Sequence, residues 1–340
     1  MDLSRVWQSY KLRVMRRYLL WRAFRARHRL RVVRNRTSAI GPDTILCVAV
    51  VRNESQRLPY FLDHHRRLGV NHFLFVDNDS SDGTTQLLSG QPDVSLWSTS
   101  ASYKAARFGL DWTTWLQMKY AHGKWCLTLD ADELLIYPYH ETRSLPDLTR
   151  YLDSIDVRAM GALMLELYPK EGINEVVYAP DQDPLEVLRY FDAGPYRSER
   201  QKPKNNLWVQ GGVRERVFFA RNRRRGPTLN KLPLVKWHWR YAYVNSTHAM
   251  LPQKLNLAYD GPGQVHLSGV LLHTKFLSIV VEKSAEEKER RQHFADPDQF
   301  GSYYDELIAG PTLWHEASVA YEDWWQLEKL GLMARGDWRG

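Results

Sequence analysis

The sequence has few cysteines, and this limits what can hold the chain together. Only Cys47 and Cys126 occur in 340 residues, and each lies in an apolar segment that is typical of a buried strand. No Cys-x-x-Cys pattern or set of paired cysteines is present, which excludes a disulfide framework. We therefore expect two free thiols in a protein of a reducing compartment.

Long apolar runs are also missing. No stretch approaches the roughly 20 apolar residues that a membrane-spanning helix needs. Arginine interrupts the N-terminal region every few residues, so this region lacks the apolar core of a signal peptide. These features predict a cytoplasmic protein, either free or peripheral on the cytosolic face of a membrane.

Acidic residues are nearly absent from the first 36 positions, which hold twelve Lys and Arg against Asp2 alone. The other 304 residues hold 35 basic and 38 acidic side chains, a net charge of −3. A nucleic-acid-binding body would carry its own basic face. We therefore expect no nucleic-acid partner for the body of the protein.

Residues 4–36 contain no Gly or Pro, and their aromatic and aliphatic side chains recur at spacings near three and four. This pattern predicts a basic amphipathic helix. Such a helix can lie in the headgroup layer of an anionic membrane, or it can pack on the body and point arginine to solvent. The sequence leaves both alternatives open.

The region after Pro42 alternates apolar segments with helical patterns. We expect strands over 44–51, 72–76, 94–97 and 125–129, and helices over 58–68, 84–88 and 103–122. Gly69 is placed to end the helix over 58–68. This alternation is the signature of an α/β fold with a mostly parallel central sheet flanked by helices.

The second half is less regular. We expect strands over 162–167, 213–220 and 271–276, and helices over 281–292 and within 303–330. The expected organisation is a basic helical arm over 1–40, an α/β domain over 41–280 and a C-terminal helical extension over 281–340.

Three polar clusters follow expected strands, where ligands bind in parallel sheets. They are Asn53-Glu54, the turn from Asp77 to Thr84, and Asp130-Ala131-Asp132. Two carboxylates at the end of a strand can hold Mn²⁺ or Mg²⁺ together with phosphate oxygens. Such an ion offsets the charge that builds up on a departing nucleoside diphosphate.

These clusters resemble the motifs of glycosyltransferase family 2. The turn reads V-D-N-D-S-S-D-G-T from Val76 to Thr84, and the preceding turn reads V-V-R-N-E from Val50 to Glu54. The segment W-C-L-T-L-D-A-D-E-L-L, from Trp125 to Leu135, is similar to a subgroup whose helix reads L-x-x-H-x-x-x-G-V, here from Leu62 to Val70.

The resemblance implies a GT-A fold, a nucleotide-diphosphate sugar donor, a divalent ion and inversion at the anomeric carbon. On matching positions, it implies that Asn53 and Glu54 lie near the nucleotide and that Asp130 and Asp132 hold ribose and metal-diphosphate. Asp77 would bind the base or ribose. Asn78 and Asp79 depart from the common pattern, so which of these three contacts the nucleotide stays open.

An inverting transfer also needs a base that deprotonates the acceptor hydroxyl. Glu215 is the first candidate, since Gly211-Gly212 allows close backbone approach. An Arg-Glu-Arg ion-pair face, with Arg214 near a diphosphate, is an equal alternative. Asp192 and Glu199 are further candidates for the base.

His273 and Lys275 lie in another expected strand. His273 is a candidate third metal ligand or a hydrogen-bonded core histidine, and Lys275 is a candidate diphosphate contact. The favoured function is metal-assisted transfer of a sugar to a saccharide or lipid-linked acceptor, in envelope polysaccharide or glycolipid synthesis. The alternatives are a metal-dependent phosphoryl-transfer or hydrolase enzyme and a non-catalytic carbohydrate- or membrane-binding relic.

Overall fold

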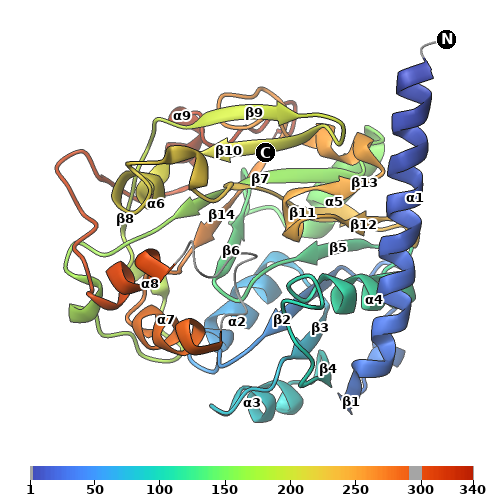
Figure 1. The fold of residues 1–340 in the computed structure, drawn as a ribbon, viewed down its shortest axis with the longest axis horizontal. Coiled ribbons are helices and arrows are strands. Elements are labelled where there is room, and N and C mark those ends of the chain that lie inside the picture. The colour runs from blue at the N-terminus through green and yellow to red at the C-terminus, as the bar shows by residue number, and fades with distance from the viewer. Residues whose placement is uncertain (1–2, 291–300, 340) are drawn as a thin grey trace.

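The computed structural model describes residues 3–290 and 301–339 and is built around one large mixed sheet (Figure 1). Along the sheet the strands lie in the order β1 (Arg31–Arg34), β4 (Val94–Ser98), β3 (His72–Asp77), β2 (Leu46–Val51), β5 (Trp125–Thr128), β11 (Asn230–Lys236), β7 (Ala159–Glu166), β14 (Gly269–His273) and β6 (Glu133–Ile136). Six of these strands run in one direction, and β1, β11 and β6 run in the other. The expected α/β class with a mostly parallel sheet is confirmed.

The helices of the first half cover the sheet, so its central strands are buried on both faces. They are α2 (Leu58–Leu68), α3 (Thr84–Gly90), α4 (Leu110–Tyr120) and α5 (Leu145–Ser154). The helix over 58–68 has the predicted bounds and ends at Gly69, whose φ of 106° suits glycine. His64 Nε2 lies 2.8 Å from the carbonyl oxygen of Leu135, which attaches α2 to β6.

The chain changes direction across the sheet at β2. It proceeds from β2 through β3 to β4 on one side and then returns to place β5 on the other side of β2. In open α/β sheets such a switch point leaves a crevice at the carboxyl ends of the strands. Glu54 and Asp130 follow β2 and β5, so this crevice is the expected place for a ligand.

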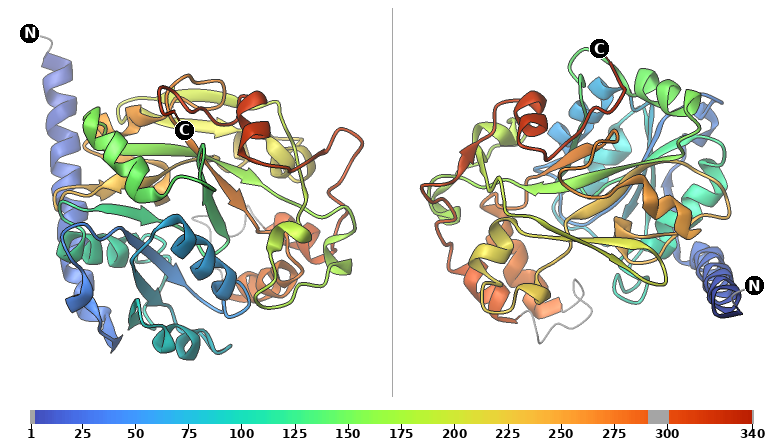
Figure 2. Two further views of the ribbon diagram at one scale, coloured as in Figure 1. Left: turned by 180° about the vertical axis from the view of Figure 1, so that it is seen from behind. Right: turned by 90° about the horizontal axis from the view of Figure 1, so that it is seen from above.

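The N-terminal helix is shorter than predicted. Helix α1 (Leu3–Ala26) replaces the helix expected over 4–36, and residues 31–34 form β1 at the edge of the main sheet. Pairing with β4 decides this outcome, because the four exposed residues of β1 show no burial pattern of their own. Figure 2 shows α1 along one side of the body, with its first turns projecting beyond it.

The segment over 213–220 is also different from the prediction. It forms α6 (Gly212–Val217) and not a strand, because Gly211 and Gly212 turn the backbone at φ of 145° and 69° before the segment begins. The remaining helices are α7 (Ile279–Arg290), α8 (Gly301–Ile308) and α9 (Trp324–Lys329). The last two residues of the helix expected over 281–292 lie outside the described residues.

Three short two-stranded sheets complete the described fold. They are β9 (Arg197–Gln201) with β10 (Asn206–Gln210), β12 (Ala242–Tyr243) with β13 (Met250–Leu251), and β8 (Tyr190–Phe191) with β15 (Val319–Ala320). Cys47 and Cys126 are buried and free, as predicted. Among the described residues, no helix combines the length and the apolar character that crossing a membrane requires.

Candidate functional site

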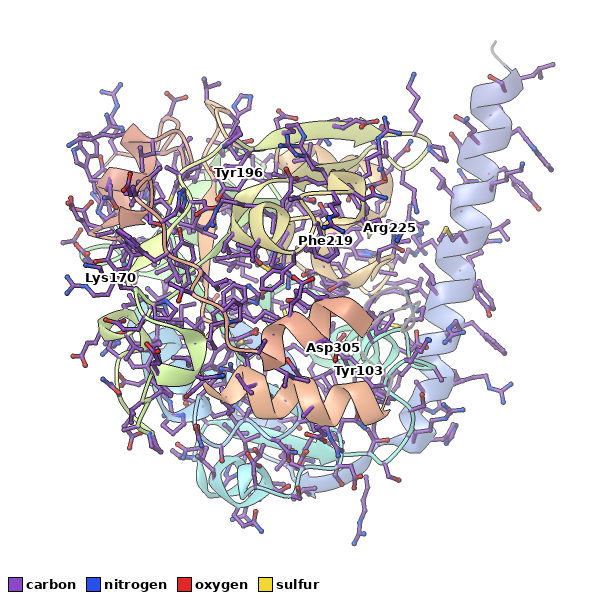
Figure 3. All side chains as sticks on the ribbon, turned by 60° about the vertical axis from the view of Figure 1, so that its left-hand side comes forward. Tyr103, Lys170, Tyr196, Phe219, Arg225 and Asp305 are labelled. Carbon is purple, nitrogen blue, oxygen red and sulfur yellow. The ribbon has the colours of Figure 1, made fainter. Side chains whose placement is uncertain are left out.

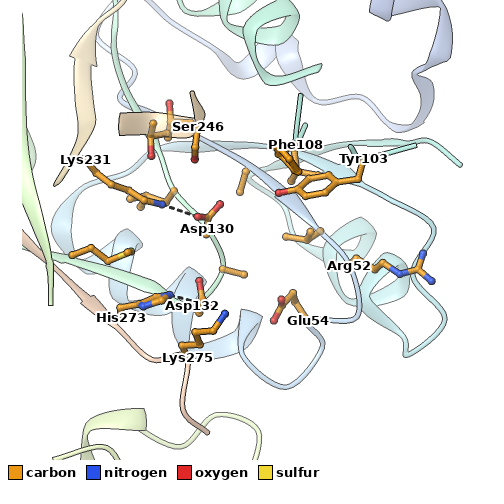
Figure 4. A pocket seen from close by; sticks show the side chains of 18 of the residues that line it. Arg52, Glu54, Tyr103, Phe108, Asp130, Asp132, Lys231, Ser246, His273 and Lys275 are labelled. Atoms are coloured by element: carbon orange, nitrogen blue, oxygen red, sulfur yellow. Dashed lines mark hydrogen bonds and ion pairs between the residues drawn. The ribbon is translucent and has the colours of Figure 1, made fainter. Parts of the chain in front are cut away.

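A cavity of about 450 Å³ lies where β2 and β5 end (Figure 4). Most of the predicted site residues line it, although they come from distant parts of the chain. They are Glu54, Asn78, Asp130, Asp132, Arg214, His273 and Lys275. The switch point of the sheet therefore brings together three predicted carboxylates, Glu54 and the two candidate metal ligands, and two predicted cations.

The carboxylate of Asp130 is about half exposed, and the buried residues Lys231 and Glu133 hold it in place. Lys231 Nζ on β11 lies 2.7 Å from Asp130 Oδ2 and also contacts Glu133. Glu133 Oε2 accepts a hydrogen bond from the backbone N–H of Asp130 at 3.1 Å. Burial raises the pKa of Glu133 to about 7. Burial opposes the charge of Lys231, but the two carboxylates outweigh it and raise the pKa of this lysine.

Asp132 is the inner carboxylate and is held by β14. His273 Nε2 lies 3.2 Å from Asp132 Oδ2. The backbone N–H of Thr274 donates to the carbonyl oxygen of Asp132 at 2.7 Å. Burial disfavours the charged carboxyl, but His273 outweighs this effect and holds the pKa of Asp132 well below its usual range. Asp132 is therefore a charged, oriented carboxylate at the cavity wall.

A second buried ion pair lies behind His273. Its Nδ1 is 3.7 Å from Glu166 Oε1, and Glu166 forms an ion pair with the buried guanidinium of Arg214. The backbone N–H of Arg214 also donates to Glu166 Oε2 at 3.3 Å. Arg214 thus lines the cavity as one member of the series Asp132–His273–Glu166–Arg214, which alternates in charge when His273 is protonated.

The turn after β2 is attached to α7. Glu54 contacts Lys283, and Arg52 Nε lies 2.9 Å from Glu286 Oε1. Asn53 Nδ2 donates to Glu286 Oε2 at 3.3 Å. Glu54, Lys283 and Glu286 line the cavity, whereas Asn53 is outside its lining. The turn after β2 therefore contributes Glu54 to the cavity, whereas Asn53 contacts α7.

The turn after β3 contributes one of its three candidates. Asp77 is buried, and its carboxylate accepts hydrogen bonds from Ser80 and Thr85, so it stabilises the turn itself. Asp79 is exposed at the surface beside Arg52. Asn78 lines the cavity and donates from Nδ2 to the carbonyl oxygen of Thr99 at 2.9 Å. The structure brings Asn78 to the cavity and leaves the two aspartates outside its lining.

The candidates for the catalytic base lie away from the cavity. Glu215 forms a two-bond ion pair with Arg197, at 2.8 and 2.6 Å, and does not line the cavity. Asp192 pairs with Arg216 at 2.8 Å, and Glu199 lies on β9. The strand expected over 213–220 is thus corrected at Glu215, which lies on α6 and directs its carboxylate to Arg197. Arg214, the neighbour on α6, does reach the cavity.

Several cavity residues were not predicted from the sequence. Lys231, Arg57 and Lys283 line it and supply most of its remaining positive charge. The sequence does indicate that Lys231 has a partner, because a lysine inside the apolar segment N-K-L-P-L-V-K needs a buried group of opposite charge. Arg57 lies in the turn before α2 and pairs with Glu54 three residues earlier, a spacing that does not by itself indicate a ligand site. Lys283 lies in the charged helix α7, and its partner Glu54 is 229 positions away, so no local pattern indicates that contact.

The donors at the cavity fit a divalent ion that a phosphate completes. Asp130 and Asp132 both line the cavity, and Mg²⁺ commonly uses one or two carboxylates together with substrate phosphates. In residues 3–290 and 301–339, no group of three or more His, Cys, Asp or Glu side chains is arranged to hold a metal by itself. The residues thus suit an ion shared with a ligand and do not form an all-protein metal cage.

Comparisons with known proteins do not determine the function of this chain. No family model and no curated protein matches the chain. One solved structure similar to it is a candidate glucose-1-phosphate thymidylyltransferase from Bacillus anthracis in complex with sucrose, at 8% identity and a TM-score of 0.28. The match covers 87% of this chain and 97% of that chain. The arrangement of the cavity residues therefore carries the functional argument by itself.

Proposed function

We propose that the cavity binds a nucleotide-diphosphate sugar and that the protein transfers the sugar, with inversion, to a saccharide or lipid-linked acceptor. One observation carries this proposal: two oriented carboxylates and a row of cations share one cavity at the switch point of the sheet. A diphosphate with a divalent ion requires both, since carboxylates hold the ion and cations neutralise the remaining phosphate charge.

Asp130 and Asp132 are the residues that would hold Mn²⁺ or Mg²⁺. His273 belongs to the same site, because its Nε2 contacts Asp132 and can support or join the ion's ligands. The bound ion would supply positive charge that stabilises the departing nucleoside diphosphate. Lys275 lies beside Asp132 at the cavity (Figure 4) and adds a second positive charge there.

The nucleoside end of the donor is proposed to lie on the β2 and β3 side of the cavity. Glu54 and Asn78 offer polar atoms there, and the rings of Tyr103 and Phe108 form an apolar wall on the same side (Figure 4). Aromatic faces and polar side chains together suit a base and a ribose. An acceptor in envelope polysaccharide or glycolipid synthesis remains the expectation from the sequence.

The phosphoryl-transfer alternative receives less support from the site. Two-metal phosphoryl-transfer sites hold their ions about 3.5–4 Å apart, bridged and flanked by several protein ligands. The cavity offers Asp130 and Asp132, and an oxygen of each already contacts Lys231 or His273. The other two carboxylates of its lining, Glu54 and Glu286, already form ion pairs with basic side chains. This donor set suits one ion better than two.

The test is turnover with a panel of UDP-, GDP- and dTDP-sugars and Mn²⁺, measured as release of the nucleoside diphosphate. We expect release from at least one donor, stimulated by a saccharide or lipid-linked acceptor, and loss of release in Asp132→Asn. Asp63→Asn, on the exposed side of α2, is the matched control and should keep full activity. Release that no acceptor stimulates would indicate a hydrolase, and no release from any donor would favour a non-catalytic relic.

A further inference from the structure

Helix α1 is fixed to the body by one face. Leu19, Ala23 and Ala26 are buried, and Leu19 packs in a small apolar cluster with Val244 and Leu251. This attachment sets the rotation of the helix, so the structure determines which of its side chains face outward.

A polar contact reinforces this attachment. The guanidinium of Arg22 donates to the buried carboxylate of Asp111 on α4, with Nη2–Oδ2 at 2.8 Å. Arg107 Nε contacts the other oxygen of Asp111 at 2.7 Å. Asp111 thus pairs with Arg22 of α1 through one oxygen and with Arg107 of the body through the other, and this fixes the position of α1 on the body.

The opposite face of α1 carries large apolar side chains that are about half exposed. Six of them are 45–57% exposed: Val6, Trp7, Tyr10, Val14, Tyr18 and Trp21. At about 100° per residue, this stripe is centred roughly opposite the stripe formed by Leu19, Ala23 and Ala26. We call it the outer aromatic face. Figure 3 shows the side chains of α1 extending away from the body along its whole length.

Basic side chains border the outer aromatic face, and no acidic side chain interrupts it. The segment Leu3–Ala26 contains seven Lys and Arg and no Asp or Glu. Lys11 Nζ lies 5.2 Å from the ring centre of Trp7, and the guanidinium of Arg25 lies 5.0 Å from that of Trp21. Cations alongside exposed tryptophans can reach phosphates while the rings stay in apolar surroundings.

We propose that the outer aromatic face binds the surface of a bilayer that contains anionic lipids. The rings of Trp7, Tyr10, Tyr18 and Trp21 enter the boundary between headgroups and acyl chains, where Trp and Tyr are enriched, and the basic side chains contact lipid phosphates. The structure supports this partner over a second copy of the chain, because pairing two such helices would bring like charges together. The proposal does not depend on the function of the cavity.

The test is co-sedimentation of the full chain with vesicles of phosphatidylcholine alone and of phosphatidylcholine with phosphatidylglycerol. We expect binding to the anionic vesicles that weakens when salt is raised from about 0.05 to about 0.5 M, since screening reduces the attraction to phosphates. Trp7→Ser with Trp21→Ser should weaken this binding about tenfold or more. Trp325→Ser, which removes a 37% exposed ring on α9, should leave binding unchanged.

A second variant tests the charges separately. Lys11→Glu with Arg17→Glu should weaken binding to the anionic vesicles and leave the melting temperature unchanged, because both side chains are exposed. Wild-type protein that ignores anionic vesicles, or a Trp7/Trp21 variant that binds them normally, would overturn the proposal. The proposal would also be overturned if the two serine substitutions abolished a dimer, or abolished binding to an RNA oligonucleotide, and left vesicle binding intact.

Discussion

Replacing Lys231 with methionine should strongly destabilise the protein, because it leaves a buried carboxylate without its cation. Glu133 is fully buried and contacts Lys231, which also holds Asp130 at 2.7 Å. Removing one partner of a buried ion pair typically costs about 3–5 kcal/mol. Lys236→Met is the matched control, since Lys236 lies on the same strand but pairs with Asp153 at the surface, where about 1 kcal/mol or less is expected.

The cost of Lys231→Met should also depend on pH. Burial raises the folded-state pKa of Glu133 to about 7, above its ordinary 4.5, so wild-type stability falls as pH rises between these values. Without Lys231 this pKa moves higher, and the variant continues to lose stability above pH 7. At about 1.36 kcal/mol per pH unit, the gap should widen by up to about 2 kcal/mol between pH 7 and 8.5.

The assay is urea unfolding in EDTA at pH 5.5, 7 and 8.5 for wild type, both methionine variants and Lys231→Met with Glu133→Gln. The double variant should recover most of the stability at pH 8.5, because glutamine removes the buried charge. A loss below about 1 kcal/mol at pH 8.5, or one that does not change with pH, would refute the assignment of this pair.

Three further predictions concern the cavity and the fold. Lys275→Met should weaken donor binding about tenfold in isothermal titration without changing the melting temperature by more than a few degrees; unchanged affinity would remove Lys275 from the diphosphate site. Glu215→Gln should keep near-normal kcat once a donor is known, because its carboxylate pairs with Arg197 outside the cavity, and a hundredfold loss of kcat would restore it as a base. Gly69→Ala should lower the melting temperature, because its φ is 106° and an added Cβ would lie 2.7 Å from Pro146 Cδ; an unchanged melting temperature would contradict a left-handed end of α2 at Gly69.

The sequence predicted the first half of the fold well, because its signals are local. The apolar segment of β2, the helical spacing of α2 and the glycine that ends it all lie within a few neighbouring residues. The carboxyl ends of β2 and β5 then follow from the alternation of strands and helices. Glu54, Asp130 and Asp132 could therefore be placed at one edge of the sheet before the structure was known.

Long-range pairing explains what the sequence could not predict. The segment after Gly212 has the apolar content of a strand, but it forms the helix α6, whose Arg214 pairs with Glu166, 48 positions earlier. The end of α1 depends on β1 pairing with β4, more than 60 positions later. Lys231 meets Asp130 across 101 positions, so no local pattern indicates that contact.

Metal-dependent donor binding is the most direct test of the proposed site. The measurement is the thermal shift produced by UDP-, GDP- and dTDP-sugars with Mn²⁺, for wild type, Asp132→Asn and the surface control Asp63→Asn. We predict that at least one donor stabilises wild type and the control only when Mn²⁺ is present, and that Asp132→Asn loses this shift. A Mn²⁺-dependent shift that persists unchanged in Asp132→Asn would contradict the account.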